Sequence, residues 1–223
     1  MKNYLKNLKI LEDGHIYNKN MEHDACGVGL IASTEGKKSR KVVEYGINAL
    51  KAVFHRGAVD ADGKTGDGAG IHLEIPSDFF IEKIELTGHK HDGSEICVGM
   101  IFLPRNNYEA QENAKTLVES ELTKSNFSIY GWRQVPVNTK VLGEKANFTR
   151  PEITQVLFKN NDKNLIGKEL ERKLYESRRK IEKKAINNAI EGFYICSLSS
   201  KSIIYKGMFL AESISDFYLD LKD

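Results

Sequence analysis

The stretch Met21–Ser33, MEHDACGVGLIAS, places a cysteine at the head of a short apolar run in which glycines alternate with larger residues. Such a run predicts a buried strand, and its glycines indicate that another part of the molecule approaches the backbone closely. Cys26 begins the run and has two interpretations. In this setting a cysteine is most often a small buried hydrophobic residue, but behind a polar leader it is also a candidate nucleophile.

Composition narrows the class of protein. The chain has 223 residues, 40% hydrophobic and 29% charged, which suits one large domain or two small ones. With 33 basic and 31 acidic residues and no basic stripe among aromatic residues, no nucleic-acid partner is indicated. No run is apolar enough to span a membrane, and the start lacks the apolar core of a secretory signal. Three cysteines without a CxxC spacing favour a reducing cytoplasm over a disulfide framework or a zinc site.

Helices and strands are predicted in blocks. The segment Lys41–Arg56 predicts a helix that buries Val43, Ile47, Leu50 and Phe54 on one face. The remaining periodic segments predict helices at 76–86, 108–124 and 167–190, strands at 71–75, 95–104, 127–137 and 152–159, and a final hairpin that turns at 199–201. Because strands and helices do not alternate strictly, we expect an α+β fold with antiparallel sheets and helices packed outside them.

Six stretches, in order, resemble the amino-terminal glutaminase domain of the glutamate synthase large subunit, which is a class II glutamine amidotransferase. Each stretch alone is a weak signal, whereas six in register are specific to this family. The resemblance runs from about Met21 to the end of the chain. It is carried by CGVGLIA at 26–32, HRGAVDAD at 55–62, TGDGAGIHLEIP at 65–76, GWRQVPV at 131–137, ERKLYESRRKIE at 171–182 and SLSSKSIIYKGMFL at 197–210.

The resemblance implies an incomplete αββα sandwich of the N-terminal-nucleophile hydrolases over residues 26–223. It also implies that Met1–Ala25 is a propeptide, cleaved between Ala25 and Cys26. Cys26 would then carry a free α-amine, whose pKa of about 7.7–8.0 leaves it partly neutral and able to take the thiol proton. The sulfur would attack the side-chain amide of L-glutamine and release ammonia. Water would hydrolyse the remaining γ-glutamyl thioester to glutamate.

Three further residues are implied as support for the nucleophile and the substrate loop. Arg56 is implied to hold the cysteine and the closing loop, although a cation at this point also suits the end of the preceding helix. Gly57 belongs to the same motif. Asp67 is either an acid of the glutamine pocket or a turn former. The glycines around Asp67 precede a strand and do not match a phosphate-binding loop, so they predict a turn bordering the pocket.

Other reactive side chains have simpler interpretations. Cys97 and Cys196 lie within apolar strands and are predicted to be inert core residues. His55 is predicted to be structural, because the α-amine already supplies a base. His89 and His91 have a spacing found in metal sites, but no further ligand is near them in the sequence, so we expect a solvated loop and no metal.

The resemblance also sets expectations beyond residues 26–223. The family's carboxylate-binding arginine motif and its Asn-Gly oxyanion donors have no counterpart here, so we expect an amino-terminal part of a larger protein, with little activity alone. FMN and an iron–sulfur cluster are implied for the full-length enzyme and none for this segment. The implied partners are the remaining synthase domains and a small electron-donating subunit; NADPH, NADH and ferredoxin all stay open as donors. The alternatives are a catalytically dead scaffold module and an N-terminal-nucleophile hydrolase with another amide substrate.

Overall fold

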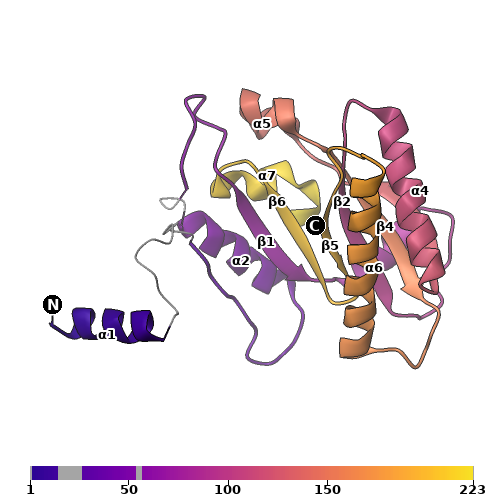
Figure 1. Cartoon of the computed structure of the whole chain (residues 1–223), viewed down its shortest axis with the longest axis horizontal. Helices are drawn as coiled ribbons and strands as arrows, with labels where there is room; N and C mark the ends of the chain where they lie inside the picture. Colours follow the sequence, from indigo (N-terminus) through magenta and orange to yellow (C-terminus); the bar gives the residue numbers. More distant parts are fainter. Residues whose placement is uncertain (1, 15–26, 54–56, 223) are drawn as a thin grey trace.

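Two antiparallel sheets form the centre of the chain in the computed structural model, which describes residues 2–14, 27–53 and 57–222 (Figure 1). The larger sheet has the strand order β3–β4–β2–β5, and the smaller one pairs β1 with β6. The strands are β1 Ala69–Glu74, β2 Ile96–Leu103, β3 Phe127–Gln134, β4 Glu152–Asn160, β5 Tyr194–Ser199 and β6 Ser202–Gly207. The predicted α+β class with antiparallel sheets is confirmed.

The inner strand β2 is nearly all apolar because it is covered on both faces. Seven of its eight residues are buried, and it pairs with β4 on one side and β5 on the other. Gly99 lies where the neighbours come closest. A β-carbon at this position would lie 2.7 Å from Val156 Cγ1 and 2.8 Å from Leu198 Cδ1. A larger residue at this position would therefore overpack the sheet.

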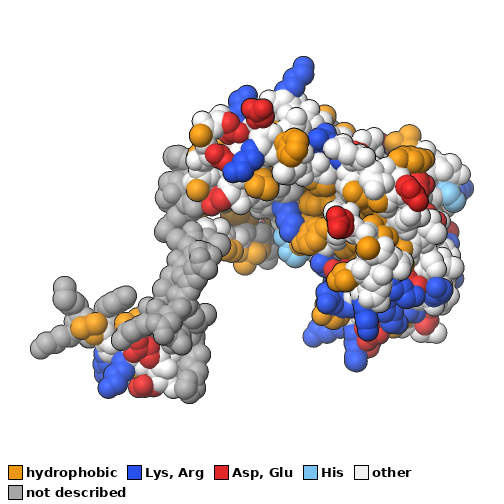
Figure 2. Space-filling view, turned by 45° about the horizontal axis from the view of Figure 1, so that its top comes forward, with side chains coloured by type: hydrophobic (Ala, Val, Ile, Leu, Met, Phe, Trp, Pro, Cys, Tyr) orange, Lys and Arg blue, Asp and Glu red, His pale blue; other side chains and the backbone are white. Residues whose placement is uncertain are grey.

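Two amphipathic helices, α4 (Tyr108–Lys124) and α6 (Gly167–Asn187), cover one face of the larger sheet. Asn107 caps α4, since its side-chain oxygen accepts a hydrogen bond from Ala110 N at 3.0 Å. The apolar edges of both helices pack on the sheet through Val118, Leu122, Leu170, Leu174 and Ile181. Lys and Arg side chains gather on the side of the body where these helices lie (Figure 2), and the charged residues of α6 lie mostly on the face turned away from the sheet.

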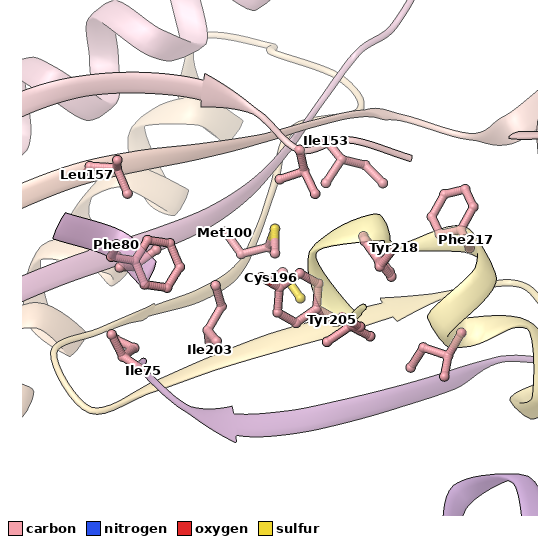
Figure 3. Packing of buried hydrophobic residues seen from close by; sticks show 14 of the residues in the cluster. Ile75, Phe80, Met100, Ile153, Leu157, Cys196, Ile203, Tyr205, Phe217 and Tyr218 are labelled. Atoms are coloured by element: carbon pink, nitrogen blue, oxygen red, sulfur yellow. The ribbon is translucent and has the colours of Figure 1, made fainter. Parts of the chain in front are cut away.

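The opposite face of the larger sheet packs against the β1–β6 pair and the carboxyl-terminal turns. Met100 and Cys196 come from the larger sheet, Phe80 from α3 (Ser77–Glu85) and Tyr205 from β6 (Figure 3). Tyr218 stacks edge to face on Tyr205 at a ring separation of 5.0 Å. Helix α2 (Arg40–Ala52) packs against β1, so that α2, the small sheet, the large sheet and α4–α6 follow one another across the molecule (Figure 1).

The prediction of a buried strand at the opening motif is wrong for its described part. Residues 27–33 form no strand, and Val28 and Leu30 are 90% and 89% exposed. An apolar run becomes a strand only when a ladder partner satisfies its backbone groups, and the local pattern does not specify that partner. Cys26, predicted to begin this strand, lies outside the described residues.

The final hairpin was predicted correctly at its turn but not in its pairing. The turn at Ser199–Lys201 joins β5 and β6, yet β5 pairs with β2 and β6 with β1, so the two strands belong to different sheets. Glu171 of α6 holds the turn: its carboxylate accepts hydrogen bonds from Ser200 N and Ser199 Oγ, both at 2.8 Å. The turn therefore carries the chain from one sheet to the other.

The remaining elements are short. Helix α1 (Lys2–Asp13) lies apart from the body (Figure 1) and was not predicted. On α2, Ile47 is buried and Val43 and Leu50 are partly buried, whereas Phe54 lies outside the described residues. No helix in the described part of the chain is long and apolar enough to cross a membrane. The remaining short helices are α5 Glu144–Thr149 and α7 Ile214–Phe217. Single 3₁₀ turns lie at Thr139–Val141, Ala211–Ser213 and Leu219–Leu221.

Candidate active site

Residues 57–68 form a small hairpin that brings two predicted support residues together. Asp67 N donates to Ala58 O at 3.2 Å, Val59 bridges to Gly66, and Asp60 N donates to Thr65 O at 2.9 Å. The base of the hairpin therefore places Asp67 opposite Ala58, next to Gly57. Arg56, the residue before Gly57, lies outside the described residues, as does Cys26.

The glycines of the TGDGAG motif are required by close packing and backbone geometry. A β-carbon on Gly66 would lie 2.7 Å from the carbonyl oxygen of Phe209, which follows β6. Gly68 has φ +134°, a conformation that side chains disfavour. The motif thus places the second arm of the hairpin directly against the end of β6. The predicted turn at this motif is wrong, because Gly66 lies in a bridge with Val59 and Ala69 begins β1, whereas the turn of the hairpin lies at 61–62.

A cavity of about 660 Å³ opens beside the base of the hairpin. Asp67 and Gly68 line it from the hairpin, and Thr149 and Arg150 line it at the end of α5. Both sheets contribute apolar walls through Ile71, Phe102, Ile153 and Ile204. The volume is within the range of small-molecule sites.

Charges of both signs line this cavity. Burial lowers the pKa of the Arg150 guanidinium, and repulsion from Arg105 adds to the effect. Lys206 donates a hydrogen bond to the Tyr194 hydroxyl at 2.7 Å. Asp67, which is exposed, supplies the negative charge. The cavity therefore combines apolar walls with charged side chains of both signs.

The two described cysteines are buried, and burial is the largest influence on the pKa of each thiol. Cys97 is fully buried, and burial raises the pKa of its thiol. Burial also raises the pKa of Cys196 to about 11, and its thiol contacts Ile204 O at 3.5 Å. Since the thiolate is the nucleophile, neither group is available for catalysis at neutral pH.

Because of these two buried thiols, we expect the free energy of unfolding to fall at alkaline pH. Their pKa values are raised in the folded state, so their contribution is complete below about pH 9 and is lost as the pH rises, for Cys196 until about pH 11. Over this range each thiol lowers the free energy of unfolding by about 1.4 kcal/mol per pH unit. The free energy of unfolding measured with urea should therefore be about 2–3 kcal/mol lower at about pH 10 than at about pH 9. The double variant Cys97→Ala, Cys196→Ala should show a shallower pH dependence; an unchanged slope would contradict this assignment.

The sequence analysis did not single out a buried ion pair between β3 and the carboxyl-terminal turn. Arg133, the arginine of GWRQVPV, donates to both carboxylate oxygens of Asp220, at 2.7 and 2.9 Å. It also donates to Gln155 Oε1 at 2.7 Å, and Gln155 is fully buried. The side chains of Arg133 and Asp220 are only 14% and 3% exposed. An arginine within an apolar strand was the available signal, but its partner lies 87 residues away.

The loop with His89 and His91 is held by ring and ionic contacts. Both imidazoles lie beside the ring of Tyr130, at centroid distances of 6.0 and 6.4 Å. Asp92 pairs with Lys159 and accepts from the Tyr130 hydroxyl at 3.3 Å. Hydrogen bonds from Lys159 and Ser94 lower the pKa of Asp92. Among the described residues, no group of three or more His, Cys, Asp or Glu side chains could hold a metal ion.

Comparison with known proteins connects these features to one family. The family model described as glutamine amidotransferases class-II matches residues 26–223. The chain is 54% identical over 217 residues to the glutamate synthase (NADPH) large chain of Azospirillum brasilense, covering 97% of this chain and 14% of that relative. It is 40% identical over 203 residues to ferredoxin-dependent glutamate synthase 2 of Synechocystis, covering 91% and 13%.

A plant relative shows the same coverage. Ferredoxin-dependent glutamate synthase 1 of Arabidopsis thaliana is 40% identical over 210 residues, which is 91% of this chain and 12% of the relative. The chain therefore spans 12–14% of the length of these relatives, and in each case nearly the whole chain is matched. Because the family model extends over residues 26–223, the chain belongs to the class-II glutamine amidotransferases.

Proposed function

We propose that this chain is the glutaminase part of a glutamate synthase large subunit, with Cys26 as its nucleophile. The observation that carries the proposal is the family match, which begins at Cys26 itself. The hairpin 57–68 supports it, since it pairs Asp67 with Ala58 and places Asp67 at a cavity of a size suited to an amino acid. Cys97 and Cys196 are buried with raised pKa values, which leaves Cys26 as the thiol for the reaction.

The proposed reaction begins with removal of residues 1–25, which frees the α-amine of Cys26. That amine takes the thiol proton, and the sulfur attacks the glutamine side-chain carbonyl carbon. The tetrahedral intermediate collapses, the carbon–nitrogen bond breaks, and ammonia leaves with the proton returned by the amine. Water then attacks the thioester, which releases glutamate and restores the thiol. Arg56, Gly57 and Asp67 would position the cysteine and the substrate.

The detailed architecture is part of the same proposal. The order of layers from α2 through the two sheets to α4–α6 supports the αββα sandwich of N-terminal-nucleophile hydrolases. The cavity is lined by residues of both sheets, which supports this arrangement.

The role of the chain in a longer protein is also proposed. Ammonia would pass to synthase domains of the same polypeptide and react with 2-oxoglutarate, with electrons supplied through FMN, an iron–sulfur cluster and a small electron-donating subunit, in the cytoplasm. The residues described here do not fit the cluster, which needs three or four cysteine thiolates. The chain has three cysteines, of which Cys97 and Cys196 stay protonated and buried.

The proposal predicts that the mature protein begins at Cys26. The gene product, meaning the full-length polypeptide of which this chain is proposed to be a part, should be purified, its amino terminus determined by mass spectrometry, and the ammonia released from glutamine measured. We expect a mass that corresponds to loss of residues 1–25, together with ammonia release. A fully active protein that retains Met1–Ala25 would contradict the α-amine mechanism. A processed protein without glutaminase activity would instead favour a scaffold module.

A further inference from the structure

We propose that Asp62 is a positioning residue for the glutaminase reaction, because it fastens the hairpin 57–68 to the first turn of α5. The inference rests on the proposed function, since the hairpin carries Gly57 and Asp67. Asp62 lies at the opposite end of the hairpin from these residues. It therefore acts through the hairpin and does not touch the substrate.

The contacts of Asp62 bind the tip of the hairpin tightly. Its Oδ1 accepts from Lys64 N at 2.9 Å and from Thr65 N at 2.7 Å, while its Oδ2 accepts from Thr65 Oγ1 at 2.6 Å. Hydrogen bonds from the side chain and backbone of Thr65, with a smaller one from the Lys145 backbone, lower the pKa of Asp62 to about 2. The carboxylate thus stays ionised throughout the neutral range.

Thr65 transmits this constraint to α5. Its side chain is buried, with the residue 2% exposed, and its Oγ1 accepts a hydrogen bond from Ala146 N at 3.4 Å. Gly143, the residue before α5, packs directly against the pair. A β-carbon at Gly143 would overlap both Asp62 Oδ2 and Thr65 Oγ1. The absence of a side chain at Gly143 is therefore a condition of the contact.

The contact joins two walls of the same cavity. Asp67 and Gly68 come from the base of the hairpin, Ala146 and Thr149 come from α5, and Arg150 directly follows it. Because Asp62 ties the hairpin tip to the start of α5, it sets the separation of these walls. A second link, Lys145 to Asp60 at 2.8 Å, is exposed at 69% and 36% and is worth little by comparison.

Two variants should disturb this contact by different means. Asp62→Ala removes the carboxylate, whereas Gly143→Ala keeps the carboxylate but displaces it. Gly143 has φ −71°, which alanine adopts without strain. In the gene product, we expect each variant to lower kcat/KM for glutamine by about 10- to 100-fold, chiefly through a higher KM, because misplaced groups bind and orient the substrate poorly. The double variant should lose no more than the worse single variant.

Amide hydrogen exchange gives a readout independent of turnover. In the parent protein the amides of Asp60, Thr65 and Asp67 donate hydrogen bonds within the hairpin. Both variants should lose protection from exchange at these three amides. Asp62→Asn keeps an oxygen for the Thr65 amide and should recover most of kcat/KM. The matched control is Asp216→Ala, which removes an exposed carboxylate paired with Lys222 and should leave both readouts unchanged.

Each remaining outcome decides the inference. Loss of protection with an unchanged kcat/KM would overturn it, because the contact would then be structural only. Unchanged protection in both variants would overturn it as well. If the parent protein released no ammonia that depends on Cys26, the proposed function would fail, whereas the exchange data would still show whether Asp62 holds the hairpin.

Discussion

Replacing Cys26 with alanine is expected to abolish ammonia release from glutamine in the gene product. The proposed mechanism passes through a bond between the Cys26 sulfur and the glutamine carbonyl carbon, and alanine offers no atom for that bond. Loss of the nucleophile in a covalent mechanism typically lowers kcat by about 10⁴- to 10⁶-fold. The measurement is ammonia release at saturating glutamine, with the amino terminus of each variant checked by mass spectrometry.

The other two cysteines provide the controls. Cys97→Ala and Cys196→Ala remove buried thiols whose raised pKa values keep them protonated, so each should retain nearly all of the activity per folded molecule. Both should be somewhat less stable, because the substitution leaves a small cavity in a close-packed core. Activity that survives in Cys26→Ala, or that disappears in a folded Cys196→Ala protein, would show that the nucleophile has been wrongly assigned.

Replacing Asp220 with alanine is expected to lower the free energy of unfolding by about 3–5 kcal/mol, the usual cost of leaving a buried charge without its partner. The Arg133 side chain, which is 14% exposed in the parent protein, would lose both hydrogen bonds to the carboxylate. Tyr205 would lose a weaker contact of 3.4 Å to the same carboxylate. Urea denaturation of the variant and the parent protein measures the difference directly.

The pair itself contributes less than this cost suggests. Arg133→Met should be destabilised because it strands the Asp220 carboxylate, but the double variant Arg133→Met, Asp220→Leu should recover much of the stability. The control Asp216→Ala breaks an exposed pair with Lys222 and should change the stability by less than about 1 kcal/mol. If the single variants at Arg133 and Asp220 had the same free energy of unfolding as the parent protein, the pair would be shown to be accessible to water.

Local patterns determined the elements that carry their own periodicity. The helix predicted at 108–124 is α4, Tyr108–Lys124, and the apolar run at 95–104 contains β2, Ile96–Leu103. The order of apolar residues along each segment sets which face is buried, and this order is visible in the sequence.

The tertiary structure alone decided the partners. Residues 27–33 form no strand ladder, and β5 and β6 belong to different sheets. Arg133 pairs with Asp220, and Asp62 contacts the start of α5. Hydrogen-bond ladders and ion pairs depend on which segments meet in space, often across many residues of chain. The sequence by itself therefore determined the long periodic elements, the family and the candidate nucleophile, whereas packing determined how the walls of the cavity are held together.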